Sequence, residues 1–220
     1  MPSSTVENYL KAILRIQESG KGTATVGDIA RELEVTPGTV TTMMRHLSEK
    51  GLIDYQPRRG LSLRPKGVTA AMKVVRRHRL IETFLVQVMG LDWSEVHEEA
   101  EILEHVISDR LLERIDKMLG EPSYDPHGDP IPDKDGKIHD LIEATPLAQA
   151  DAGSYRVVRV SDGNSALLGW LNEKGMTIGE EFELSHPDRA AGLLEIVKKE
   201  GGRVQLGINV AEHVYVEAAG

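Results

Sequence analysis

Two short amphipathic segments joined by a tight turn restrict the fold of this chain more than any other feature. The first, TVGDIARELEV, carries apolar residues at helical spacing: Val26, Ile29, Ala30 and Leu33. The second, TPGTVTTMMRHLSEKG, begins with Thr36 as a favourable N-cap and Pro37 in the first turn, and Gly51 ends it. Because only a short turn separates them, the two segments predict a helix-turn-helix.

The flanking residues extend this pattern. TVENYLKAILRIQESG predicts an earlier helix that begins with Thr5 as its N-cap and stops at Gly20. After Gly51, two short strands are expected, Leu52–Tyr55 and Leu61–Leu63, on either side of the basic turn QPRRG. Helix, helix, short turn, helix and basic hairpin is the order of a winged helix-turn-helix.

The side chains of this region suit contact with DNA. Short hydroxyls and an arginine on the third helix can reach base edges, and arginines at a wing tip commonly meet phosphate or the minor groove. The expected DNA-binding residues are Thr36, Pro37, Thr39, Thr41, Thr42, Arg45, Arg58 and Arg59. A three-helix unit with a hairpin can also be a protein-interaction module, but the basic wing favours DNA.

Charge is unevenly distributed along the chain. Residues 1–75 contain 11 Lys and Arg against 7 Asp and Glu, whereas the remainder contains 15 against 28, within a net charge of −9. A basic N-terminal part on an acidic remainder agrees with DNA binding by the former, although chance variation in surface charge would also account for the numbers.

Composition narrows the remaining possibilities. Cysteine is absent, which excludes disulfides, zinc–thiolate sites and thiol nucleophiles. No run of about 18 apolar residues predicts a membrane span, and the N-terminus lacks the features of a secretory signal. We therefore expect a cytoplasmic protein that would hold any metal through oxygen and nitrogen atoms.

The stretch VHEEAEILEHV combines acids and histidines with apolar residues. His97, Glu101, Glu104 and His105 are spaced so that one helix would carry all of them on one face. An earlier predicted helix has His78 and Glu82 one turn apart. If residues 70–89 and 94–119 form a helical hairpin, these six side chains can converge on a metal ion. The alternative is a solvated polar face with incidental histidines.

The chemistry of this set favours a hard cation. Carboxylates and imidazoles without a sulfur ligand suit Mn(II) or Fe(II), although intrinsic affinity would favour Zn(II) and Cu(II).

The C-terminal part has a different pattern. EPSYDPHGDPIPDKDGK is dense in Pro, Gly and Asp and predicts a loop. After it, short β-like runs alternate with turns, which suggests a small barrel or sandwich. The runs are SYRVVRVSD, ALLGWLNEKG, EEFELSHP, LLEIVKKEGG, RVQLGIN and HVYVEAA. Trp170 and Leu171 are expected in its core.

Several motifs, in this order, resemble the diphtheria-toxin-repressor family of metal-dependent transcription regulators. They are TVENYLKAI, DIARELEVTPGTVTTMMRHLSEKGLI, RRHRLIETFL, GLDWSEVHEEAEILEHVISD and PHGDPIP. The resemblance implies a mainly α protein with a small β domain. Its expected domains are a winged helix-turn-helix at 1–73, a helical metal-binding and dimerisation domain at 74–140, and an SH3-like, ferrous-transport-A-type domain at 141–220.

The resemblance also implies metal ligands. The primary site would use Glu101, Glu104 and His105 with His78 nearby, and glutamate at 101, where the iron branch has cysteine, resembles the manganese branch. A second site would draw on the following residues: Glu82, His97, Asp125, His127 and Asp162.

The first helix departs from the family pattern. Asn8 stands where the family has Asp or Met, and its amide oxygen is a neutral, weaker donor to a hard cation. The neighbouring Glu7 is expected to point elsewhere on the helix.

The resemblance implies a homodimeric repressor of metal-uptake genes that binds pseudo-palindromic operator DNA when Mn(II), or alternatively Fe(II), is abundant. Metal would link the first helix to the dimerisation domain and so fix the spacing of the two recognition helices. No enzymatic activity, small organic substrate or membrane partner is expected. The alternatives are a metal-dependent hydrolase, which would lack an evident nucleophile, and a metal-independent DNA-binding protein.

Overall fold

The computed structural model describes residues 3–57, 59–139, 141–185, 191–199 and 201–219 and divides into two compact units. The first contains residues 1–78, 103–109 and 132–139, and the second contains residues 79–102, 110–131 and 140–220. In the described part of the chain, no helix is long and apolar enough to span a membrane.

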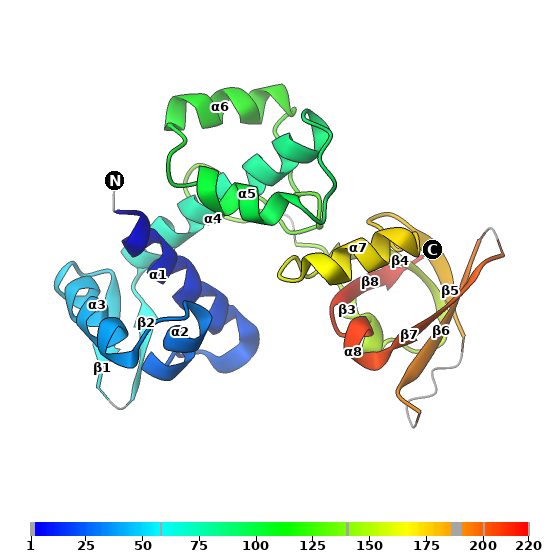
Figure 1. Cartoon of the computed structure of the whole chain (residues 1–220), viewed down its shortest axis with the longest axis horizontal. Coiled ribbons are helices and arrows are strands. Elements are labelled where there is room, and N and C mark those ends of the chain that lie inside the picture. The colour runs from blue at the N-terminus through cyan, green and yellow to red at the C-terminus, as the bar shows by residue number, and fades with distance from the viewer. Residues whose placement is uncertain (1–2, 58, 140, 186–190, 200, 220) are drawn as a thin grey trace. The chain divides into compact units, whose positions relative to one another are not determined.

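The first unit contains the winged helix-turn-helix (Figure 1). Its elements are α1 (Ser4–Ile16), the π-helical turn η1 (Gln17–Lys21), α2 (Val26–Glu32), α3 (Pro37–Glu49), β1 (Ile53–Gln56) and β2 (Gly60–Leu63). The two strands pair antiparallel, with Tyr55 opposite Leu61. Leu10, Ile29 and Leu47 from the three helices are fully buried in its apolar core, together with Ile53 of the wing.

Local signals explain where these helices begin. Thr36 accepts a hydrogen bond from the backbone N–H of Thr39 at 3.2 Å and caps α3, as expected. Thr25 and Asp28 form a capping box at the start of α2. The N-cap of α1 is Ser3, whose hydroxyl accepts from the N–H of Val6, so the expectation of Thr5 in this role was wrong.

The helices that follow differ from the expected hairpin. The helix α4 (Pro65–Gln87) covers most of the expected segment 70–89. The segment 94–119 is interrupted and forms α5 (Val96–Leu103) and α6 (Asp109–Met118). Ser and Asp favour helix starts, and the new helix α6 begins at Asp109, directly after Ser108. Glu104 and His105 therefore lie in the turn after α5, and not on its face.

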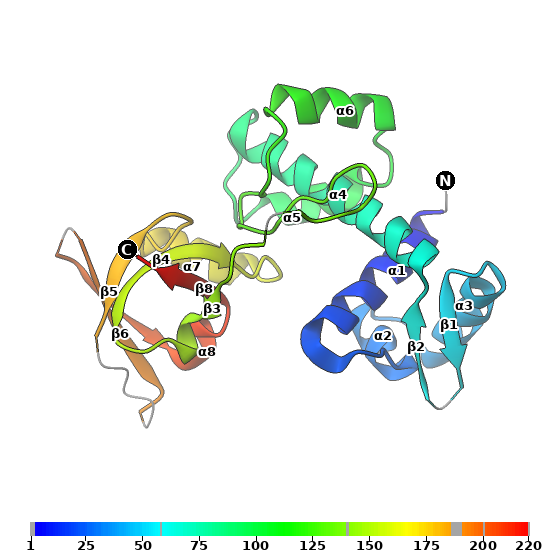
Figure 2. The same cartoon turned by 180° about the vertical axis from the view of Figure 1, so that it is seen from behind.

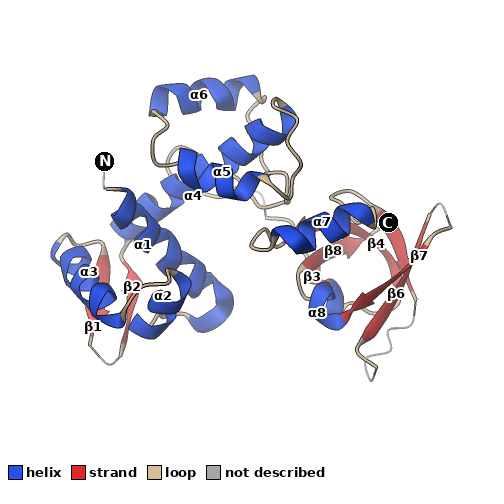
Figure 3. Ribbon diagram, viewed as in Figure 1, coloured by secondary structure: helices blue, strands red, loops and turns tan. Residues whose placement is uncertain are grey.

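The C-terminal part is built on a six-stranded antiparallel sheet in the order β3-β8-β4-β5-β6-β7, seen from behind in Figure 2. The strands are β3 (Thr145–Pro146), β4 (Gly153–Val160), β5 (Glu181–Leu184), β6 (Leu193–Lys198), β7 (Arg203–Gly207) and β8 (Val214–Ala218). The helical elements are the 3-10 turn η2 (Leu147–Gln149), α7 (Ser165–Glu173) and α8 (Ile208–Ala211) (Figure 3).

One β-like run of this part was interpreted wrongly. ALLGWLNEKG forms the helix α7, because the side chain of Asn164 accepts from the N–H of Leu167 at 3.0 Å and caps it. Leu168 and Leu171, one turn apart, are fully buried in the core, and Trp170 packs against that core. The core position expected for Leu171 is confirmed, whereas Trp170 is half-buried at the edge of that core. The domain boundaries at residues 73 and 140 stay predictions.

Candidate metal centre

Glu82 lies at the centre of a group of acidic and histidine side chains in the second unit. It is fully buried on α4, and its two carboxylate oxygens face different imidazoles. Its Oε1 is 3.4 Å from Nδ1 of His97 on α5, and its Oε2 is 3.8 Å from Nδ1 of His127. We call Glu82, His97, Asp125, His127 and Asp162 the Glu82 cluster.

Two sets of three donors share Glu82. Glu82, Asp125 and His127 are all buried, and each offers one ligand atom within 4.8 Å of the others. Glu82, His97 and Asp162 do the same. His97 is also 3.7 Å, through Nε2, from Oε1 of Glu101, one turn further along α5. The second unit therefore brings together all five ligands expected for the second site and places Glu101 beside one of them.

A tight turn positions Asp125 and His127. Oδ1 of Asp125 accepts hydrogen bonds from the backbone N–H groups of His127 and Asp129, both at 2.9 Å. The carbonyl of His127 accepts from the N–H of Val160 at 2.9 Å, which fastens the turn to the end of β4. The side chain of Asp125 and the backbone of His127 are therefore fixed by hydrogen bonds, as a preorganised site requires.

Gly128 is the residue that allows this turn to approach the sheet. Its φ is +85°, and a Cβ atom there would lie 2.0 Å from the carbonyl oxygen of Val158. We expect Gly128→Ala to lower the free energy of unfolding by at least about 1–3 kcal/mol, the usual cost of this backbone conformation in other residues, with the steric clash in addition. Urea unfolding measures the change.

Gly169→Ala is the matched control in the same unit. A Cβ atom at this position of α7 would meet only Ser94 Oγ, at 4.0 Å, so this variant should be as stable as the wild type or slightly more stable. Equal stability of the two alanine variants would show that the Asp125–His127 turn does not need glycine.

One ring nitrogen of His127 is engaged by the backbone, and the other, Nδ1, is available to bind a cation. Nε2 is 2.8 Å from the carbonyl oxygen of Trp93, which can only accept, so Nε2 carries the proton. The indole of Trp93 stacks on the imidazole at 5.6 Å between centroids. Nδ1 faces Glu82 and Asp125 and, among the described residues, is buried without a hydrogen bond. This is the arrangement of a metal-binding histidine oriented by a backbone carbonyl.

The Glu82 cluster and the residues paired with it carry an excess of negative charge. Five carboxylates are present: Glu82, Glu101, Asp125, Asp129 and Asp162. Two guanidinium groups approach them within 3.4–3.5 Å, Arg79 at Asp125 and Asp129 and Arg159 at Asp129. With neutral imidazoles, three negative charges are left, and one divalent cation would neutralise two of them.

The pKa values of two buried members, Asp125 and His127, reflect the same excess of negative charge. Burial, followed by the neighbouring carboxylates of Asp129 and Glu82, raises the pKa of Asp125 to about 8 despite Arg79. Burial opposes protonation of His127, but the Glu82 carboxylate and then Asp125 outweigh it and raise the pKa of His127 to about 9. Without a metal, the cluster therefore retains protons where a cation would bind. The oxygen and nitrogen donors fit Mn(II) or Fe(II).

The remaining expected ligands lie in the first unit, where a lysine of α1 meets them. Glu104 is fully buried, and its carboxylate accepts from Nζ of Lys11 at 2.9 and 3.0 Å and from Nδ1 of His78 at 2.6 Å. Lys11 is itself 6% exposed, and its Nζ lies 3.5 Å from Nδ1 of His78. The ammonium group therefore lies among the side chains expected to hold the primary metal.

A second ion pair joins α1 to the same residues. His105 is 2.8 Å, through Nδ1, from one oxygen of Glu7, and Arg77 donates to the other oxygen at 2.5 Å. Glu7 is buried, so the expectation that it points elsewhere was wrong. We call Glu7, Lys11, Arg77, His78, Glu104 and His105 the α1 cluster. Asn8 is half-buried, and its Oδ1 is buried without a hydrogen bond among the described residues; its role as a ligand stays a prediction.

Sequence reasoning missed Lys11 and the role of Glu7. A signal was available, since the two residues are one turn apart on α1 and the apolar neighbours of Lys11, Leu10 and Leu14, face the core. A charged residue inside an apolar helix face is normally buried only with a partner. The partner, Glu104, is far away in the sequence, and only the fold identifies it.

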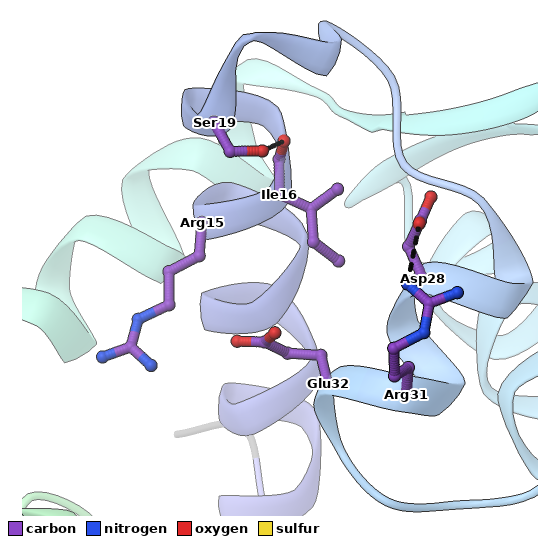
Figure 4. A pocket seen from close by; sticks show the side chains of 6 residues that line it. All are labelled: Arg15, Ile16, Ser19, Asp28, Arg31 and Glu32. Atoms are coloured by element: carbon purple, nitrogen blue, oxygen red, sulfur yellow. Dashed lines mark hydrogen bonds and ion pairs between the residues drawn. The ribbon is translucent and has the colours of Figure 1, made fainter. Parts of the chain in front are cut away.

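A separate pocket of about 230 Å³ lies between α1 and α2, and none of the expected ligands lines it (Figure 4). The residues that line it are Arg15, Ile16, Ser19, Asp28, Arg31 and Glu32. Asp28 is engaged by the capping box with Thr25 and lies 3.6 Å from Arg31, and Ser19 donates to the carbonyl of Ile16. These side chains have local structural partners, and none was expected to bind metal or DNA.

The expected DNA-binding residues occupy the exposed side of α3. Thr39, Thr42 and Arg45 are exposed at intervals of one turn, whereas Val40, Met44 and Leu47 on the opposite side are buried. Thr41 and Thr42 donate their hydroxyls to the carbonyls one turn earlier, at 2.9 and 3.1 Å, which leaves the oxygen lone pairs as acceptors. Thr36 and Pro37 lie at the exposed start of α3 and Arg59 in the wing, while Arg58 lies outside the described residues.

Three family profiles match consecutive parts of the chain. They are the iron dependent repressor N-terminal DNA binding domain at residues 1–61, the iron dependent repressor metal binding and dimerisation domain at 64–133, and the FeoA domain at 145–218. Their order agrees with a winged helix-turn-helix, a helical domain and a C-terminal β domain, and it confirms the expected fold class.

Individual proteins show the same likeness over nearly the whole chain. The diphtheria toxin repressor of Corynebacterium efficiens is 30% identical over 97% of this chain and 95% of its own length. That of Corynebacterium diphtheriae is 36% identical over 84% and 85%. A solved structure described as a manganese-dependent transcriptional repressor in complex with manganese matches with a TM-score of 0.91 and 36% identity, over 97% of this chain and all of that one.

These relatives are repressors and not enzymes, and the profiles assign DNA binding to the domain that contains α3, and metal binding and dimerisation to the domain that contains Glu82, His97, Asp125 and His127. The chain belongs to the diphtheria-toxin-repressor family and is a metal-dependent, DNA-binding transcriptional repressor.

Proposed function

We propose that this repressor is activated by Mn(II) and represses genes for metal uptake as a homodimer bound to pseudo-palindromic operator DNA in the cytoplasm. The observation that carries the choice of metal is the donor set of the Glu82 cluster. Carboxylates and imidazoles surround Glu82, no sulfur ligand belongs to the cluster as described, and three negative charges are left over. Hard oxygen donors with imidazole suit Mn(II).

The likeness to a solved manganese-dependent repressor supports the same choice. Fe(II) is the second candidate, because the matching family profiles are described as iron dependent. A bound divalent ion supplies two positive charges at the Glu82 cluster. Glu82 on α4 and His97 on α5 would hold this ion together with Asp125, His127 and Asp162, which lie in the turn at 125–129 and in the segment after β4.

DNA recognition is proposed for α3 and the wing. The exposed strip of α3 carries Thr39, Thr42 and Arg45, whose side chains can read base edges in the major groove. Arg58 and Arg59 in the wing, with Thr36, Pro37 and Thr41 at the start of α3, would contact the backbone or the minor groove.

The test is anaerobic capture of genomic DNA fragments on the purified protein at fixed salt, in chelator and with Mn(II), Fe(II) or Zn(II). We expect a few fragments to be retained with Mn(II) only, and their sequences would identify the operators. Equal retention in chelator would refute metal activation, and retention with Fe(II) but not Mn(II) would overturn the choice of metal.

Two substitutions separate base reading from backbone contact. Thr42→Ala should change the preferred operator sequence, whereas Arg59→Ala should weaken binding to all sequences alike and lower the slope of log affinity against log salt by about 1. Fluorescence anisotropy with the operator and a scrambled duplex at several salt concentrations measures both effects. The reverse outcome would mean that α3 does not read the bases.

A further inference from the structure

We propose that the ammonium group of Lys11 is the permanent cation of the α1 cluster. In this view the cluster holds α1 without a divalent metal, and the chain takes its regulatory metal only in the Glu82 cluster. The inference rests on the proposed function in one respect, that the Glu82 cluster is the site that takes metal.

The contacts of Lys11 place its ammonium group between the side chains of Glu104 and His78. Nζ of Lys11 lies within 3.0 Å of both oxygens of Glu104 and 3.5 Å from Nδ1 of His78. It therefore lies where an ion shared by these two side chains would have to be. Two imidazoles contact the same carboxylate: Nδ1 of His78 lies 2.6 Å and Nε2 of His105 lies 3.5 Å from an oxygen of Glu104.

The charges of the α1 cluster balance without a metal ion. The α1 cluster contains two carboxylates, Glu7 and Glu104, and two permanent cations, Lys11 and Arg77, so with neutral imidazoles it is already balanced. A divalent ion added to it would leave two uncompensated positive charges among buried side chains, which is strongly unfavourable. The Glu82 cluster, with three negative charges left over, has the opposite balance.

The charged side chains of the α1 cluster are buried. Glu7, Lys11, Arg77, His78 and Glu104 are all at most 7% exposed. To admit a metal, the ammonium group would have to leave Glu104 and find another partner or water, because an unpaired buried charge is costly. The ordinary reason to bury a lysine is a fixed partner, and both oxygens of Glu104 provide it.

The consequence concerns how α1 is attached. Within the first unit, Lys11–Glu104 and Glu7–Arg77, with the contact from His105 to Glu7, join α1 to α4 and to the turn after α5. A family member in which metal makes this link would have a loose α1 in chelator. In this chain α1 stays attached in chelator, and the metal-dependent step is confined to the Glu82 cluster.

The first test counts metal ions on the full-length protein. We expect equilibrium dialysis against excess MnCl2, with metal analysis of the protein, to give about one Mn(II) ion per chain for the wild type and none for Glu82→Gln. Lys11→Met removes the ammonium group and keeps the length of the side chain, and it should raise the ratio to about two. Lys73→Met, an exposed lysine on α4, is the matched control and should stay at about one.

The second test needs no variant, so a folding defect in Lys11→Met does not affect it. Anomalous diffraction from wild-type crystals grown with excess MnCl2 should show manganese between Glu82 and His127 and none at Glu104. Manganese at Glu104, with Lys11 turned away, would overturn the inference while leaving the proposed function intact. Absence of manganese from the Glu82 cluster would refute the proposed function instead.

Discussion

Replacing Glu82 with glutamine should lower the affinity of the chain for Mn(II) by at least about 100-fold. Loss of a residue that only hydrogen-bonds a metal ligand costs up to about 100-fold in affinity, and loss of a direct ligand should cost at least as much. Glu82 is the one residue that both triads of the Glu82 cluster share. The substitution removes one negative charge and replaces an oxygen that faces His97 or His127 with an amide nitrogen that cannot ligate. Isothermal titration with MnCl2 measures the affinity.

The same variant should lose the metal-dependent retention of operator DNA while keeping its weak, non-specific binding. Glu99→Gln, on the exposed side of α5, makes the same chemical change outside the cluster and should match the wild type in both measurements. Thermal unfolding in chelator controls for folding. Wild-type Mn(II) affinity in a folded Glu82→Gln protein would remove this residue from the metal site.

Replacing Glu104 with alanine should lower the free energy of unfolding in chelator by about 3–5 kcal/mol, the usual cost of removing one partner from a buried ion pair. Glu104 is fully buried and is the carboxylate that Lys11 contacts, so its loss leaves a buried ammonium group without a counter-ion. A residue that served only as a metal ligand would not contribute such stability when metal is absent.

The double variant Lys11→Met, Glu104→Ala should recover much of this loss, because both charges are then removed together. Urea unfolding of the wild type, both single variants and the double variant gives the coupling energy directly. Additive effects of the two substitutions would show that the pair does not stabilise the fold. That result would also contradict the role proposed for Lys11.

The winged helix-turn-helix was predictable because its signals are local. Thr36 as cap, Pro37 in the first turn and Gly51 after the end define α3, and the strands of the wing start and end within one residue of their expected bounds. The prediction of a single helix over residues 94–119 was wrong, and the reason is also local. Apolar periodicity continues through Ser108, but a helix start at Asp109 outweighs it.

For the candidate ligands too, the sequence could predict the residues but not which of them lie close together. His97, Glu82, Asp125, His127 and Asp162 could be named from the sequence because acids and histidines are scarce on apolar surfaces and because a family pattern orders them. Which of them converge could not be named, since Asp162 is 80 residues from Glu82 in the sequence and reaches the cluster only through β4. The role of Glu7 was misjudged for the same reason: its partners Arg77 and His105 are distant in the chain.

The sequence by itself determined the domain types, the candidate DNA-reading helix and the hard character of the candidate metal ligands, because these depend on residue type and on spacing within one segment. Only the tertiary structure decided which ligand set is left with negative charge. Packing places Lys11 against Glu104 and Arg77 against Glu7, but it leaves the Glu82 cluster with more carboxylates than cations. Coulomb interactions depend on distance in space, and folding sets that distance.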